Sequence, residues 1–133
     1  MVTVEMVNSQ RWFEPNSRVE DMQRTMAAST RSAGEITIVD LVGQIDLGSS
    51  PALRKTLLNS LKTTNHMAIN LGGVSYIDSS GIASLVEVLK EAQNSKKRLV
   101  LFGVGGAVFQ VLQLTRLTGI FEIAQTEEQV LHG

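Results

Sequence analysis

The stretch Val74-Ser75-Tyr76-Ile77-Asp78-Ser79-Ser80-Gly81-Ile82 decides how this chain is expected to fold. Its apolar approach ends at Ile77, small and polar residues follow, and a helix is predicted from Ser79 or Ser80 to about Gln93. Apolar residues three and four positions apart give that helix one buried face: Ile82, Leu85, Val86 and Leu89. A strand that leads directly into a helix is typical of an α/β domain.

On both sides of this stretch the chain alternates between strand and helix patterns. Apolar, often β-branched runs predict strands at 35–42, 67–71 and 99–102. Helices are expected from Ser50, as a cap with Pro51 in the first helical position, and after the glycines at 103–106. Thr126 and Gln129 form a capping-box pattern for a short last helix. The sequence therefore predicts an α/β fold whose mostly parallel or mixed central sheet carries about four helices.

Length and composition fit one folded domain without covalent cross-links. The chain has 133 residues and no cysteine, and its 12 basic and 13 acidic residues give a net charge of −1. Charge spread in this way offers no basic stripe for nucleic acid. We expect residues 22–133 to form the domain and residues 1–21 to be an amino-terminal extension. The extension, which holds Trp12, is either a loosely packed arm or a contact for a partner or a second copy.

The chain carries no sequence pattern for export or for a membrane span. Glu5 and Asn8 interrupt the apolar residues at its start, unlike a secretory signal. The uncharged stretch 99–115 approaches the shortest membrane-spanning length, but its glycines and glutamines favour a strand, a turn and a helix start. We therefore expect a cytoplasmic protein with no membrane insertion.

The hydroxyls of Ser79 and Ser80 fall where the predicted helix begins. Unpaired backbone N–H groups and the positive end of the helix dipole favour an anion there, so a phosphoryl group on either serine would be tolerated. The same residues equally allow Asp78 or Ser79 to be a helix cap and nothing more. Local physics leaves both interpretations open.

Several motifs together resemble the STAS domain family. Asp78 to Ile82, preceded by 69–71 and 74–77, resembles its signature, and more specifically that of bacterial anti-sigma factor antagonists. Gly43 to Leu47 is similar to the family's Gly-x-Leu-Asp element, with Ile45 in place of leucine. The segments from 99 to 121 are similar to its carboxy-terminal strand, helix and turn. The resemblance covers residues 34–131 and implies a STAS-like fold, whose usual first strand should lie within residues 22–30.

The resemblance implies a phosphorylation switch. Ser80 would be the phosphorylated residue, with Ser79 as the alternative, and Asp46 would lie near it so that Asp46 and Asp78 form an acidic rim. The implied partners are an anti-sigma factor that is also a serine kinase of the GHKL type, and a PP2C-type phosphatase. The implied partner-binding residues are Asp46, Asp78, Ser79, Ser80, Gly81 and Ile82. No catalysis, cofactor or metal is expected of this chain.

Other functions have weaker support in the residues. A related alternative is a STAS scaffold subunit of a phospholipid-trafficking ABC transporter, and another is a phosphorelay scaffold of the stressosome type. Gly103, Gly105 and Gly106 suggest a dinucleotide-binding turn, but Val108 stands where the pattern needs glycine. Ser80 lies in no Gly-x-Ser-x-Gly elbow, which disfavours a hydrolase.

Overall fold

A computed structural model describes residues 26–132 of the chain. Nine elements follow one another in these residues: β1 Ala27–Ala33, β2 Ile36–Ile45, α2 Ser50–Leu61, β3 His66–Ile77, α3 Ser79–Asn94, β4 Arg98–Phe102, α4 Gly106–Leu114, β5 Glu122–Ala124 and α5 Glu127–His132. The amino-terminal extension predicted for residues 1–21 lies outside the described part. The prediction of an α/β fold with about four helices is confirmed, because α2 to α5 accompany the sheet.

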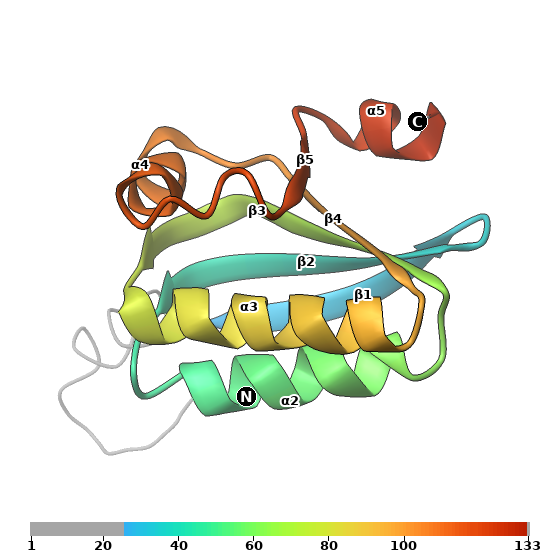
Figure 1. The fold of residues 1–133 in the computed structure, drawn as a ribbon, viewed down its shortest axis with the longest axis horizontal. Helices are drawn as coiled ribbons and strands as arrows, with labels where there is room; N and C mark the ends of the chain where they lie inside the picture. The colour runs from blue at the N-terminus through green and yellow to red at the C-terminus, as the bar shows by residue number, and fades with distance from the viewer. Residues whose placement is uncertain (1–25, 133) are drawn as a thin grey trace, which may run out of the picture.

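The described strands form one mixed sheet in the order β1-β2-β3-β4-β5 (Figure 1). β1 and β2 form an antiparallel hairpin through Gly34, whose positive φ of 66° suits glycine. The remaining neighbours, β2 with β3, β3 with β4 and β4 with β5, pair in parallel. Parallel pairing brings the carboxyl ends of β2 and β3 to the same edge of the sheet, next to the start of α3.

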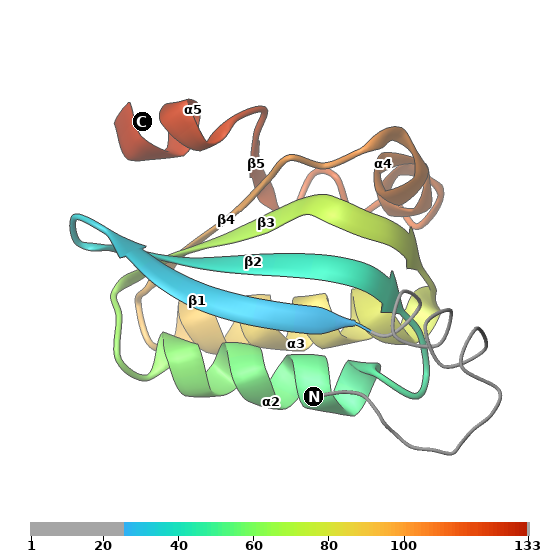
Figure 2. The same cartoon turned by 180° about the vertical axis from the view of Figure 1, so that it is seen from behind.

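Two layers of apolar side chains bury the two faces of the sheet. Val39, Leu41 and Ile45 of β2 pack in one cluster with buried residues of α2, α3 and α4. Ile38 belongs to a smaller cluster on the other face, which Val130 of α5 completes. Figure 2, seen from behind, shows β1 passing in front of α3, with the two long helices beneath the sheet.

Three details differ from the sequence prediction. Helix α2 begins at Ser50 with Ser49 as its N-cap, so Ser50 is not the cap, and no side chain caps this helix. β2 continues through Gly43 instead of stopping there, and the expected interruption appears as a shift of register between Gly43 and Gln44. β1 overlaps only the last part of the segment proposed for the first strand and extends to Ala33.

One charged cluster ties the edge strand β1 to the last helix. The Arg31 guanidinium bonds both oxygens of Asp40 in β2, at 2.6 and 3.2 Å, and both oxygens of Glu127 in α5, at 3.0 and 2.6 Å. Asn70 adds a hydrogen bond to Asp40 at 2.8 Å. These contacts lower the pKa of Asp40 and of Glu127, in each case chiefly through the bond with Arg31.

Candidate functional site at the start of helix α3

The backbone turns from β3 into α3 at Asp78, and the side chain of this residue caps the helix. Asp78 has extended backbone angles, φ −107° and ψ −174°, as N-cap residues do. Its Oδ1 accepts hydrogen bonds from the N–H groups of Ser80, at 2.9 Å, and Gly81, at 3.2 Å. Its own N–H donates to the carbonyl of Ile45 at the end of β2, at 3.0 Å. The capping role that the sequence allowed is thus confirmed for Asp78.

The Ser80 hydroxyl lies between an acidic side chain and a second serine. Ser80 Oγ donates to Asp78 Oδ1 at 2.5 Å and lies 2.9 Å from Ser50 Oγ in the first turn of α2. Ser50 Oγ in turn donates to the carbonyl of Asp46 at 2.7 Å. These three short oxygen–oxygen contacts share only two protons, those of the Ser50 and Ser80 hydroxyls. At any moment one of the three contacts therefore has no hydrogen between its oxygens.

Asp78 supplies no further proton to this cluster near neutral pH. The hydrogen bond from the Ser80 hydroxyl is the largest cause that lowers the pKa of Asp78, and the N–H groups of Gly81, Ser80 and Leu47 lower it further. The carboxyl group is therefore ionised and acts only as an acceptor. The hydroxyl of Ser80 is therefore the donor in the 2.5 Å contact with Asp78.

Two buried serines hold the starts of α2 and α3 together; sequence analysis named Ser50 only as a helix cap and did not name Ser84. Ser50 is 4% exposed and Ser84 is 6% exposed. The Ser84 hydroxyl donates to the carbonyl of Ser80 at 3.1 Å and reaches that of Ser50 at 3.4 Å. No local sequence pattern predicts these contacts, because Ser50 and Ser80 are 30 positions apart in the chain.

Asp46 meets the site through its backbone and not through its carboxylate. Its Oδ1 accepts hydrogen bonds from the N–H groups of Gly48 and Ser49, at 3.0 and 3.1 Å, within its own turn. Its carbonyl accepts the Ser50 hydroxyl, which contacts Ser80. One bridging hydroxyl therefore joins Asp46 to Ser80.

The other predicted site residues divide into exposed and supporting positions. Ser79 is exposed, and its hydroxyl makes no hydrogen bond to another described residue. Gly81 and Ile82 are buried, Ile82 with 3% exposure, so both shape the helix start from beneath. A Cβ on Gly81 would lie 2.6 Å from Ile45 Cγ2 and 2.7 Å from Ile77 Cγ1, which explains why glycine stands there.

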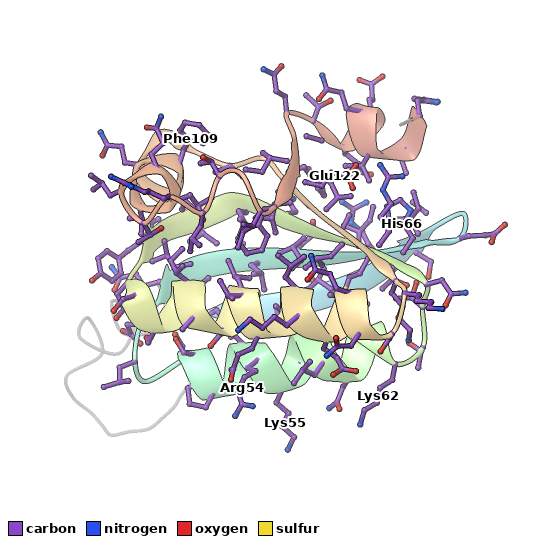
Figure 3. All side chains as sticks on the ribbon, viewed as in Figure 1. Arg54, Lys55, Lys62, His66, Phe109 and Glu122 are labelled. Atoms are coloured by element: carbon purple, nitrogen blue, oxygen red, sulfur yellow. The ribbon has the colours of Figure 1, made fainter. Side chains whose placement is uncertain are left out.

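Two grooves flank the helix pair, and only the smaller one touches the site. A mostly apolar groove of about 410 Å³ runs from Ser79 along α3 to Thr115 and Leu117. A larger groove of about 690 Å³ lies between α2 and the end of α3. Lys55, which lines it, points from α2 away from the sheet (Figure 3), whereas Arg54 reaches to 3.4 Å from Glu87 of α3. The larger groove is lined by Pro51, the neighbour of Ser50, but by none of the site serines. The smaller groove is lined by Ser79 and is therefore the one that belongs to the site.

The part of the chain that the structure describes contains no cluster of potential metal ligands and no helix that could span a membrane. Within residues 26–132 no three His, Asp or Glu side chains come together as a metal site requires. Over the same range, no helix combines the length and apolar character needed to cross a bilayer.

Fold and site together define a mixed α/β domain with a serine cluster at the start of a helix that follows a parallel strand. The sequence model of the STAS domain matches residues 27–130. The chain therefore belongs to the STAS domain family, as its motifs predicted.

Named relatives and solved structures agree with this assignment. The chain is 31% identical over 91 residues, 68% of its length and 80% of the relative, to a Listeria monocytogenes protein named anti-sigma-B factor antagonist. A Staphylococcus epidermidis protein of the same name is 28% identical over 91 residues, covering 68% of this chain and 84% of the relative.

The solved structures establish the fold. An anti-sigma factor antagonist from Mycobacterium paratuberculosis superposes with a TM-score of 0.75 at 19% identity, over 82% of this chain and 93% of that one. The Bacillus cell fate determinant SpoIIAA in its phosphorylated form gives a TM-score of 0.62 at 20% identity, over 80% and 97%. The prediction of a STAS-like fold is confirmed.

Proposed function

We propose that this chain is an anti-sigma factor antagonist whose partner binding is switched off by phosphorylation of Ser80. The observation that carries the proposal is the Ser80 hydroxyl, bonded at 2.5 Å to the ionised Asp78 at the start of α3. A serine hydroxyl must be held in a defined orientation to attack a phosphoryl group, and the hydrogen bond to Asp78 holds that of Ser80. The names of the relatives from Listeria and Staphylococcus support the class of function.

The cap geometry suggests how a phosphoryl group would act. Asp78 already occupies the N–H groups of Ser80 and Gly81, so a phosphate does not find those two amides free and meets a carboxylate beside them. Phosphorylation adds about −1.5 to −2 charges at neutral pH and removes the Ser80 proton. The 2.5 Å contact with Asp78 then joins two acceptors, so the side chains must separate and carry the added charge toward solvent.

The partner in this proposal is an anti-sigma factor that is also a serine kinase of the GHKL type. The unphosphorylated chain binds it in the cytoplasm and so frees a sigma factor. Phosphorylation of Ser80 releases the kinase, and a PP2C-type phosphatase restores binding. The phosphate needs to remove only a modest part of the binding free energy, because each tenfold loss of affinity corresponds to about 1.4 kcal/mol. Like charges placed together at an interface cost several kcal/mol, which is more than that amount.

The decisive experiment uses purified anti-sigma kinases from the same genome. Each is incubated with ATP and the full chain, and the modified residue is mapped by mass spectrometry. Ser80→Ala should abolish labelling and bind a cognate kinase persistently, whereas Ser80→Asp should bind at least tenfold more weakly.

Ser79→Ala is the matched control, because Ser79 is exposed and its hydroxyl makes no hydrogen bond to another described residue. It should leave labelling intact. Labelling of Ser79 alone would move the switch to that residue. The absence of both binding and labelling with every kinase would refute the switch and favour a scaffold role.

A further inference from the structure

Among the described residues, strand β1 forms an edge of the sheet that no other strand covers. It pairs with β2 along its whole length, from Ala27 opposite Val42 to Ala33 opposite Ile36. Within residues 26–132 no strand pairs with its other side, and β1 forms the border of the sheet (Figure 2). Six of its seven residues are exposed. Within the described part of the chain, its outer backbone N–H and C=O groups face no strand and could pair with one.

This edge lacks the features by which proteins usually prevent strand pairing. Protective edges carry lysine or proline, or a bulge that twists them away. Residues 27–33 read Ala-Ala-Ser-Thr-Arg-Ser-Ala, with neither lysine nor proline, and their pairing with β2 shows no shift of register. The only charged side chain, Arg31, is held by Asp40 and Glu127 instead of guarding the edge.

We infer that β1 is a self-association edge, on which β1 of a second copy of this chain pairs antiparallel about a two-fold axis at Thr30. This register uses all seven residues of the strand and sets Thr30 opposite its own copy, a favourable cross-strand pair. It sets Arg31 opposite Ser29, so no like charges face each other. A register centred on Arg31 would oppose two guanidinium groups and is disfavoured.

The size of this edge makes the association reversible. Seven residues span roughly 24 Å, and a contact made chiefly by one strand pair buries less than the roughly 1,000 Å² of a stable interface. The two copies together would form a continuous ten-stranded sheet from their described strands. Ser80 lies at the start of α3 and takes no part in this pairing, so the inference stands independently of the proposed switch.

The chain contains no cysteine, which allows a position-specific cross-linking test in the full-length protein. Across the proposed axis the two Thr30 Cα atoms would be roughly 4.5–5.5 Å apart, within the range of a disulfide. The two Ser29 Cα atoms would be roughly 8 Å apart, beyond that range. Under mild oxidation Thr30→Cys should form disulfide dimers at least tenfold faster than Ser29→Cys. Equal rates, or no dimer from Thr30→Cys, would overturn the inference.

A charge-exchange experiment tests the same register without oxidation. Thr30→Lys and Thr30→Glu change an exposed side chain, and each alone would place two like charges across the axis. Sedimentation velocity should show weaker self-association for each variant than for the parent, and association restored in their equimolar mixture. If both variants associate as the parent does, or if the mixture stays monomeric, Thr30 is not at the axis and the inference fails.

Discussion

Replacing Gly81 with alanine sets two effects of opposite sign against each other. Glycine inside a helix is less favourable than alanine by about 0.8–1 kcal/mol, so helix propensity alone predicts stabilisation. The added Cβ would lie 2.6 Å from Ile45 Cγ2 and 2.7 Å from Ile77 Cγ1. Both isoleucines are buried, with 0% and 4% exposure, and branching at Cβ restricts rotation away from the contact.

Overpacking of this kind costs about 1–3 kcal/mol, which exceeds the gain in helix propensity. We therefore expect Gly81→Ala to lose about 1 kcal/mol, with a limit of roughly 2 kcal/mol. In urea unfolding followed by circular dichroism, this lowers the midpoint by roughly 0.5–1 M at the slope usual for small proteins.

Gly106→Ala is the matched control for this measurement. Gly106 is also in the first turn of a helix, α4, but no atom lies within 4 Å of its added Cβ. This variant should be as stable as the parent or more stable. If Gly81→Ala were also as stable as the parent or more stable, Ile45 and Ile77 would have to move aside at no cost in free energy. The account of close packing beneath the site would then be wrong.

Two further predictions concern charged groups. Because the pKa values of Asp40 and Glu127 are lowered in the folded state, their stabilising effect is present near neutral pH and is lost as the pH falls from about 4.5 through those lowered values. Arg31→Gln should therefore flatten the acid limb of stability measured by urea midpoints from pH 7 to 3, and an unchanged limb would contradict this role. Asp78→Ala removes the cap of α3 and should cost about 1 kcal/mol of unfolding free energy, whereas Asp78→Asn should retain most of it; equal losses would show that the cap hydrogen bonds contribute little.

The parts of the fold that can be predicted from sequence are those with a regular pattern of apolar residues or a helix-capping residue nearby in the chain. Helix α3 has an apolar face and an acceptor at its start, and it was placed to within about one residue at each end. β4 has a continuous apolar run and was also predicted. The residue pattern alone predicted neither β5 nor the bounds of β1, which only the resemblance expected within residues 22–30, because their residues are small, polar or few.

The candidate site divides in the same way. Asp78 and Ser80 are two residues apart and belong to one motif, so the sequence could suggest both. The contact of Ser50 with Ser80 depends on how α2 packs against α3, which no local pattern encodes. The shift of the α2 start by one residue has a similar origin, since the Ser50 hydroxyl bonds the carbonyl of Asp46 instead of capping the helix.

The count of protons at the site connects the proposed switch to the packing of the helices. In the unmodified chain two protons serve three contacts that run from Asp46 through Ser50 and Ser80 to Asp78. A phosphoryl group replaces the Ser80 proton, so the Ser50 proton is the one hydroxyl proton that remains among these contacts. The contact between Ser80 and Asp78 then becomes repulsive. The cap of α3 and the junction of α2 with α3 would then weaken together. Phosphorylation would thus change the shape of the start of α3 as well as its charge, and the contacts of buried Ser50 in α2 would change with it.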